Sequence, residues 1–288
     1  MRAKCIAFAH HKGGTGKTTS CINIAGGLAK KGKKVLVVDL DPQASATVGL
    51  GINKNYLPVS LYDALFDRCN NEGKIGIKDV IISTEIDNIH LVPATLDLAG
   101  ILVSMHDTKD ASRILNQILD EVRDNYDYIL IDTPPSYSFF LINAIVAADH
   151  IVLPLDTGYF SMESIETFAT ILKDIEDELG VKKDINTVIV TKFQESKFHS
   201  LYQKISQRLP ALSKLISLQD PIKKIEDEIK IYLSVRASFN GDLFLVPYSK
   251  EVYEAQKKGL PVSHCMPDGK IGGIYRGITQ RMVDGISI

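Results

Sequence analysis

Short apolar segments alternate with helical patterns along most of this chain. Each apolar segment is brief and bounded by turn residues, which is typical of buried strands. These segments span residues 4–10, 33–41, 89–94, 126–135, 150–156, 186–193 and 242–249. Between them, apolar residues recur every three or four positions, which predicts helices at 18–31, 113–123 and 161–179. This alternation predicts an α/β fold, namely a doubly wound, mostly parallel sheet with helices on both faces.

Residues 194–241 depart from this alternation. The stretch is helical in pattern and rich in Lys, Leu and Ile, and Pro221 is expected to divide it into at least two helices. No linker, repeat or low-complexity tract separates it from the rest of the chain. We therefore predict a single domain over residues 1–288, with a helical elaboration at about 194–241.

The composition, 45% hydrophobic and 24% charged, is that of an ordinary soluble globular protein. No run of about 18 apolar residues is present, so the sequence predicts no membrane span. The apolar stretch at the N-terminus is too short for a signal peptide, and a cytoplasmic location is therefore expected. The four cysteines are scattered without metal-ligand spacing, which favours reduced thiols in small apolar sites.

Charge is divided unevenly between the two parts of the chain. Residues 1–180 carry 16 Lys and Arg against 24 Asp and Glu, a net charge of −8. Residues 181–288 carry 17 against 11, a net charge of +6. The basic second part is consistent either with an anionic partner or with an ordinary solvated surface.

The stretch HHKGGTGKTT, residues 10–19, lies between the first predicted strand and the first predicted helix. Glycines at this junction let the backbone wrap around an anion, and the helix N-terminus adds a favourable dipole. Lys17 would reach the β- and γ-phosphates of a nucleotide, and Thr18 would offer its hydroxyl to Mg²⁺. The stretch departs from the standard G-x-x-x-x-G-K-[ST] pattern, because His11 stands where a glycine is needed and a second lysine, Lys12, precedes the glycines.

Three aspartates stand at predicted strand ends, where ligands of parallel sheets bind. Asp132 ends YILID and matches the Walker B aspartate that serves a magnesium ion. Asp39 and Asp41 end VLVVDLDPQ, and strand alternation places both side chains on one side. Two carboxylates beside a phosphate loop favour roles near Mg²⁺ and in orienting an attacking water. The alternative for this pair is a turn-forming Asp-Pro sequence.

Several blocks in this order resemble the ParA family, within the ParA/MinD group of deviant Walker ATPases. They are KGGTGKTT, VLVVDLDPQASAT, VPATLDLAG (92–100), YDYILIDTPPS (126–136), ADHIVLPL (148–155) and VPYSKEVYEAQKKGLPV (246–262). The resemblance covers nearly the whole chain, and long collinear blocks are more specific than a phosphate loop alone. It implies a P-loop ATPase fold that binds ATP and Mg²⁺.

The resemblance also implies roles for individual residues. Lys12 takes the place of the signature lysine, which reaches across a homodimer interface to the partner's nucleotide, so that ATP joins two subunits. Asp41 would position the hydrolytic water, with Lys12 and Lys17 as the catalytic cations, and Asp41 and Asp132 would join Thr18 around Mg²⁺. The residues implied in nucleotide binding are Lys12, Gly13, Gly14, Thr15, Gly16, Lys17, Thr18, Thr19, Asp132, and, near the adenine, Lys192 and Pro247.

This chain departs from the family pattern at two places. His10 and His11 stand where the family often carries an asparagine, and we interpret them as polar residues at a strand end rather than as catalytic groups. The family's late block often reads Pro-Arg-Asn, with the arginine implicated in DNA binding. Residues 247–250 here read Pro-Tyr-Ser-Lys, so DNA binding is not carried over through that arginine.

By resemblance, the function is an ATP-dependent switch for partitioning a chromosome or plasmid. The ATP dimer would bind non-specific DNA through lysines and arginines, with nucleoid association, and a ParB-type centromere-binding partner would stimulate slow hydrolysis. The alternative is a MinD-like, membrane-associated positioning ATPase, which needs a terminal basic amphipathic helix. Residues 273–288 carry only two arginines as cations and two interior glycines, which favours a helix docked on the core and no stable membrane association.

An electron-transfer protein of the nitrogenase iron-protein type shares this kind of loop. That chemistry needs paired thiolates at a dimer interface. Cys5 lies in a predicted core strand and Cys21 on a predicted helix face, which argues against it.

Overall fold

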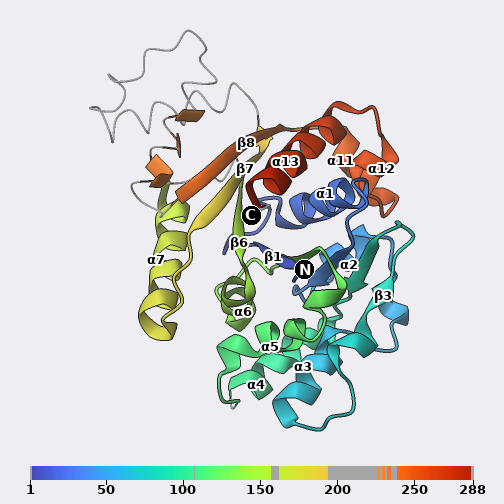
Figure 1. Cartoon of the computed structure of the whole chain (residues 1–288), viewed down its shortest axis with the longest axis vertical. Coiled ribbons are helices and arrows are strands. Elements are labelled where there is room, and N and C mark those ends of the chain that lie inside the picture. The colour runs from blue at the N-terminus through green and yellow to red at the C-terminus, as the bar shows by residue number, and fades with distance from the viewer. Residues whose placement is uncertain are drawn as a thin grey trace. The chain divides into compact units, whose positions relative to one another are not determined.

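The computed structural model describes residues 2–106, 108–156, 162–193, 226–227, 229–230, 232–234 and 239–286. Within them, eight strands form a sheet in the order β3-β4-β2-β5-β1-β6-β7-β8 (Figure 1). The strands are β1 Lys4–Phe8, β2 Val35–Asp39, β3 Ile82–Ser83, β4 Ile89–Val92, β5 Tyr128–Asp132, β6 His150–Asp156, β7 Ile185–Phe193 and β8 Phe239–Pro247.

Helices connect the strands, and short 3₁₀ turns are placed among them. The α-helices are α1 Lys17–Ala29, α2 Ser45–Gly49, α3 Leu61–Asn70, α4 Ile101–His106, α5 Ile114–Asp120, α6 Phe139–Ala147, α7 Met162–Leu179, α11 Lys250–Lys257, α12 Val262–Cys265 and α13 Lys270–Ile286. The 3₁₀ turns are η1 Lys54–Tyr56, η2 Ile77–Val80, η3 Leu96–Gly100, η4 Ala111–Arg113 and η5 Arg123–Asn125.

Most of the strand pairing is parallel, as predicted. β5 pairs in parallel with β1 and β2, β2 pairs in parallel with β4, and β7 pairs in parallel with β8. By contrast, β3, two residues long, runs antiparallel to β4 at the edge of the sheet. The predicted α/β class is therefore confirmed.

The described chain divides into two compact units. The first comprises Met1–Ile151 and Ser249–Ile288, and the second comprises Val152–Tyr248. The single domain that we predicted over residues 1–288 remains a prediction. Most of the helical elaboration predicted at about 194–241 lies outside the described residues.

In the first unit, helices cover both faces of the parallel strands. α1 and α13 lie on one side of the strands and α5 and α6 on the other (Figure 1). Every residue of β2 and β5 is buried, which explains why these strands read as continuous apolar runs rather than as alternating patterns. Cys5 in β1 and Cys21 in α1 are buried in this core.

In the second unit, α7 contributes an apolar stripe to the core around β7 and β8. Ile165, Phe168, Leu172 and Ile175 are all buried, and their spacing of three or four residues places them on one face of the helix. Three residues in the middle of β7, Val188–Val190, are also buried, as expected for a strand covered by helix.

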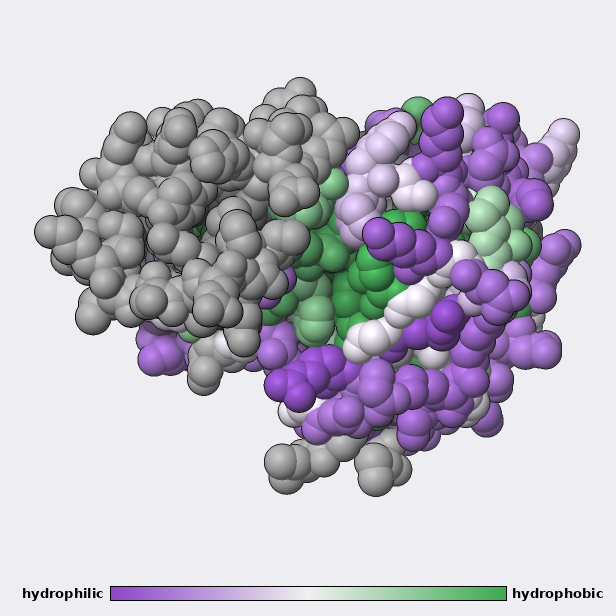
Figure 2. Space-filling view, turned by 90° about the horizontal axis from the view of Figure 1, so that it is seen from above, coloured by the Kyte–Doolittle hydropathy of each residue, from purple (hydrophilic) through white to green (hydrophobic). Residues whose placement is uncertain are grey.

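The last helix, α13, packs against α1 through its apolar face. Ile271, Tyr275, Ile278 and Met282 are buried, so the prediction of a helix docked on the core agrees with the structure. The face in Figure 2 is mostly hydrophilic over the described residues away from the grey atoms. Across the described part of the chain, no helix combines the length and apolar character needed to cross a membrane.

Contact between α1 and α13 depends on a glycine. A Cβ atom at Gly27 would lie 2.4 Å from Oγ1 of Thr279, well inside van der Waals distance. Thr279 is fully buried, and its hydroxyl donates to the carbonyl of Tyr275 one turn earlier, at 2.7 Å. The two helices can approach this closely only because Gly27 has no side chain.

We expect Gly27→Ala to lower the free energy of unfolding by about 1–3 kcal/mol, because the added methyl group overpacks the α1–α13 contact. Gly277→Ala is the matched control, since Gly277 lies on the exposed side of α13 with nothing within 4 Å of an added Cβ. In the control, the free energy of unfolding should rise by up to about 1 kcal/mol, because alanine has a higher helix propensity than glycine. Equal melting temperatures for the two variants in calorimetry would contradict the close approach described here.

Candidate nucleotide-binding site

The glycine-rich loop lies between β1 and α1, as the sequence predicts. Gly14 and Gly16 adopt positive φ angles of 73° and 89°, a conformation that side chains disfavour. Gly16 is the N-cap of α1 and supplies no capping side chain. The first amides of α1 are therefore left for an external acceptor, and with the helix dipole they make a site suited to an anion such as phosphate.

Lys17 folds back over this loop. Its side chain is buried, and its Nζ donates to the carbonyl oxygen of Lys12 at 2.9 Å. Burial lowers the pKa of Lys17, and the neighbouring carboxylates of Asp132 and Asp41 offset only part of this effect. An ammonium group thus sits at the loop and near the buried carboxylates, where it can meet the oxygens of a bound phosphate.

Thr18 and Asp132 meet at the end of β5. The Thr18 hydroxyl donates to Oδ2 of Asp132 at 2.6 Å. The other oxygen, Oδ1, is buried and has no hydrogen-bond partner among the described residues. Burial, followed by the charge of Asp39, raises the pKa of Asp132 well above its ordinary value. This carboxylate is short of positive charge, and a divalent cation would supply it.

The residues present fit a magnesium ion that is bound together with a nucleotide. Within the described ranges, no group of three or more His, Cys, Asp or Glu side chains could hold a metal by itself. Mg²⁺ at nucleotide sites is typically bound by one or two protein oxygens, with phosphate oxygens and waters completing its shell. Thr18 and Asp132 offer such a partial set of oxygens.

Asp39 and Asp41 differ in their surroundings, although the sequence presents them as a pair. β2 ends at Asp39, which is fully buried and accepts from the N–H and hydroxyl of Thr47, both at 2.7 Å, and from the N–H of Asp41 at 3.2 Å. Asp41 lies in the following turn, where its Oδ1 accepts from the N–H of Gln43 at 2.9 Å. Asp39 therefore anchors α2 to the sheet, and Asp41 is the carboxylate placed in the turn.

The segment after Asp132 lies beside the loop. Thr133 is buried and its hydroxyl donates to the carbonyl of Phe8, the last residue of β1, at 2.8 Å. A Cβ atom at Gly13 would lie 3.5 Å from Cβ of Pro135, an ordinary van der Waals contact. The loop and the segment that follows β5 are therefore neighbours, as the shared edge of parallel strands requires.

Gln256 links the last quarter of the chain to the loop, and sequence reasoning missed it. Its Nε2 donates to the hydroxyl of Thr19 at 3.1 Å, one residue beyond Thr18. The block at 246–262 was available as a signal, but nothing in it distinguishes Gln256 from its neighbours. Only the packing of α11 near the start of α1 identifies the residue.

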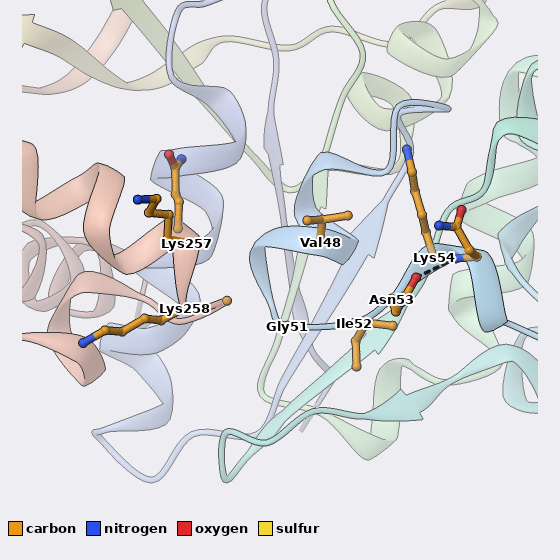
Figure 3. Close-up of a pocket in the computed structure, with 10 residues that line it drawn as sticks. Val48, Gly51, Ile52, Asn53, Lys54, Lys257 and Lys258 are labelled. Carbon is orange, nitrogen blue, oxygen red and sulfur yellow. Dashed lines mark hydrogen bonds between the residues drawn. The ribbon is translucent and has the colours of Figure 1, made fainter.

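A cavity of about 430 Å³ lies next to this link, between residues 48–55 and 256–259. Its lysines do not converge on one point. Figure 3 shows Lys257 and Lys258 extending away from Val48 and Ile52. Nζ of Lys257 lies 5.0 Å from the ring centroid of Tyr253. The arrangement is not that of a built anion site.

Lys192 and Pro247 lie in the second unit, at the ends of neighbouring strands. Pro247 ends β8 and pairs with Phe193 of β7. Nζ of Lys192 forms an ion pair with Oδ2 of Asp156 at 2.7 Å, and its backbone has a positive φ of 53°. The structure places the two residues on adjoining strands of one unit. Their contact with adenine remains a prediction.

The chain is similar to proteins of a known family. Residues 3–187 match the family described as the AAA domain. The chain is 37% identical over 188 residues to the sporulation initiation inhibitor protein Soj of Bacillus subtilis, covering 65% of this chain and 72% of that protein. It is 32% identical over 262 residues to the chromosome-partitioning ATPase Soj of Treponema pallidum, covering 90% and 89%.

A solved structure shows the same fold. A cobyrinic acid a,c-diamide synthase from Mycobacterium smegmatis, solved with an ATP analogue and magnesium, has a TM-score of 0.74 at 21% identity. The match covers 99% of this chain and 96% of that one. At this identity the likeness establishes the shared architecture alone.

The altered phosphate loop, the aspartate at the end of β5 and the parallel sheet define the class of protein: a P-loop ATPase with a second lysine ahead of its glycines. The length of the family match and of the alignments with the two relatives identifies the family within that class. The chain belongs to the ParA/Soj family of chromosome-partitioning ATPases.

Thr47 is the residue through which the buried Asp39 can be tested. Its hydroxyl donates to Asp39 and accepts from the N–H of Ala94 at 3.0 Å. Thr47→Val removes both bonds in a buried setting, so we expect the free energy of unfolding to fall by about 1–3 kcal/mol. Thr47→Ser keeps the hydroxyl and should change it by less than about 1 kcal/mol.

The penalty of the valine variant should depend on pH. Burial raises the pKa of Asp39 from 3.8 to about 6, so its contribution to stability is complete below about pH 4 and is lost as pH rises through about 6. Valine removes a donor that favours the ionised form. Chemical denaturation should therefore show a larger penalty at about pH 7.5 than at about pH 4.5, and a pH-independent penalty would contradict this account.

Proposed function

We propose that this protein is an ATP-dependent switch that partitions DNA. In this proposal it binds ATP and Mg²⁺, forms a homodimer around the nucleotides, binds DNA without sequence preference, and returns to the free form after slow hydrolysis. A ParB-type partner stimulates that hydrolysis. One observation carries the proposal: the loop with Lys12, Lys17 and Thr18 lies beside Asp132. Burial raises the pKa of this carboxyl group, and too little positive charge lies near it to offset that effect.

The nucleotide is held by the loop from Lys12 to Thr19. In the proposal, the amides that follow Gly13, Gly14 and Gly16 bind phosphate oxygens, Lys17 neutralises the β- and γ-phosphates, and Thr18 and Asp132 hold Mg²⁺. When bound, the ion neutralises the charge that develops on the transferred phosphoryl group. A protein of the same fold has been solved with an ATP analogue and magnesium, so the architecture is compatible with this ligand.

Asp41 is the residue to which we assign the hydrolytic water. It lies in the turn after β2, is largely buried and has Oδ1 directed to its own turn through the N–H of Gln43. Asp39 is fully engaged with Thr47 and with the N–H of Asp41. Because both oxygens of Asp39 already accept hydrogen bonds within the protein, Asp41 is the better candidate for this role.

Lys12 is assigned to the dimer. Its side chain is half-buried at the loop, next to two exposed glycines, Gly13 and Gly14. A cation at the mouth of one site balances triphosphate charge in a facing site and costs little when no partner is present. The second lysine is the feature that distinguishes this loop from one that needs only Lys17.

DNA binding is the least constrained part of the proposal. Of the lysines of α11 and the turn after it, Lys250, Lys257 and Lys258 are exposed, and they would contribute contacts to phosphates. Many other basic residues of the second half lie outside the described residues. We expect a cytoplasmic, nucleoid-associated protein. The apolar face of α13 is buried against α1, whereas a MinD-like membrane helix would present its apolar face to lipid.

Co-sedimentation with DNA tests the switch. We expect DNA to pellet the protein with ATP and Mg²⁺, but to pellet it weakly with ADP or without nucleotide. Binding should fall steeply between low and high salt, because phosphate contacts release counterions. Equal pelleting in every nucleotide state would overturn the switch, and pelleting with anionic liposomes in place of DNA would favour the membrane alternative.

Substitution of the two lysines separates dimerisation from nucleotide binding. Lys12→Ala should retain ADP binding by the monomer within about threefold, yet abolish ATP-induced dimers in analytical ultracentrifugation, because triphosphate charge loses its balancing cation. Lys34→Ala is the control and should dimerise as the wild type does. Lys34 is exposed just before β2, at the end of that strand opposite to Asp39 and the loop.

Asp41→Ala provides a second comparison within the site. It removes a charge next to the nucleotide but should keep ATP-induced dimers while losing turnover.

Dimers that persist in Lys12→Ala would overturn the role of Lys12.

A further inference from the structure

The main chain of Lys12 is held on both sides by side chains of the same loop. Its N–H donates to Nδ1 of His10 at 3.0 Å, and its carbonyl accepts from Nζ of Lys17 at 2.9 Å. Peptide groups are planar, so restraining the ones before and after the Cα atom of Lys12 restrains both of its backbone dihedrals. The direction in which the Lys12 side chain leaves the loop is therefore set by His10 and Lys17.

The hydrogen bond defines the protonation of His10. A ring nitrogen that accepts carries no proton, so the imidazole is neutral, with its hydrogen on Nε2. The ring is fully buried and stacks on His11 with centroids 4.7 Å apart and an interplanar angle of 20°. Burial, followed by the charges of His11, Lys17 and Lys12, lowers the pKa of His10 to about 3. The acceptor is thus retained throughout the neutral range.

The two restraints on Lys12 differ in what nucleotide binding does to them. Lys17 is also the group expected at the β- and γ-phosphates, so its ammonium divides its hydrogen bonds once nucleotide enters. His10 is fully buried, and its Nδ1 is directed at the Lys12 N–H. His10 is therefore the restraint that nucleotide binding leaves in place.

We propose that His10 is a positioning residue for the ATP-dependent dimer: its Nδ1 fixes the backbone of Lys12, so that the lysine side chain is presented to a facing protomer. This inference rests on the proposed role of Lys12. It gives His10 a defined task, whereas the sequence suggests only a polar residue at a strand end. His11 stacks on the ring of His10, a packing contact that an apolar side chain can keep, and it makes no comparable bond to Lys12 among the described contacts.

Two variants isolate the acceptor. In His10→Asn, the side-chain Oδ1 falls at the place of Nδ1 and can accept from the same N–H. In His10→Leu, a methyl group falls there and cannot accept. The control is His11→Leu, at the half-buried neighbour whose Nδ1 has no hydrogen-bond partner among the described residues. Each full-length protein is measured for ADP binding as a monomer and for ATP-induced dimerisation by ultracentrifugation.

We expect His10→Leu to bind ADP as the wild type does but to weaken the ATP-induced dimer by at least about tenfold, equivalent to 1.4 kcal/mol. His10→Asn and His11→Leu should dimerise within about threefold of wild type. The inference is overturned if His10→Leu dimerises normally, if His10→Asn is as weak as His10→Leu, or if His10→Leu loses ADP binding in parallel. A wild type that forms no ATP-dependent dimer would instead refute the proposed function itself.

Nuclear magnetic resonance tests the same inference without any substitution, in case the leucine variant does not fold. The ¹⁵N shifts of the His10 ring should show a protonated Nε2 and an unprotonated Nδ1, with no titration between about pH 5 and pH 9. The Lys12 amide should exchange slowly with solvent. A ring that is protonated on Nδ1, or that titrates near its ordinary pKa, would overturn the assignment.

Discussion

The site depends on one electrostatic constraint: two buried aspartates at the carboxyl ends of β2 and β5 need positive charge nearby in order to ionise. Asp39 and Asp132 are partners in the parallel register of the two strands, and both are fully buried. Burial raises the pKa of both carboxyl groups, and the charge of Asp39 raises that of Asp132 further, as the charge of Asp41 does for Asp39. Lys17 brings one ammonium group close to them. These charges suit the end of the two strands to a divalent cation, while the loop suits phosphate.

α1 connects the loop and Asp132 to other parts of the first unit. Its N-terminus carries the loop, Thr18 reaches the carboxylate of Asp132, and Thr19 receives the side chain of Gln256. The other side of the helix packs on α13, where Gly27 allows close contact. Residues from the start, the middle and the end of the chain are thereby brought to one helix.

The phosphate loop and its aspartates were predictable because their chemistry is local. Glycines at a strand–helix junction, followed by Lys17 and Thr18, need no distant partner to be recognised, and Asp132 follows an apolar strand that reads clearly. The predicted strands appear with their ends shifted by a few residues, since hydrogen bonding rather than polarity decides where a strand stops. The predicted helix at 113–123 is realised as α5, Ile114–Asp120, with 3₁₀ turns beside it. Short helices such as α2 and α6 escaped prediction, because one is only five residues long and the other is apolar on nearly all sides.

The sequence by itself determined the α/β class, the place of the loop and the identity of the residues that surround it, because periodicity and spacing report on neighbours along the chain. Only the tertiary structure decided how those residues divide their tasks. It assigns Asp39 to Thr47 and Asp41 to its own turn, ties Gln256 to Thr19, and turns His10 from a polar strand-end residue into an acceptor for the Lys12 amide. These distinctions rest on burial and on hydrogen bonds between groups that folding brings together, which no pattern along the chain records.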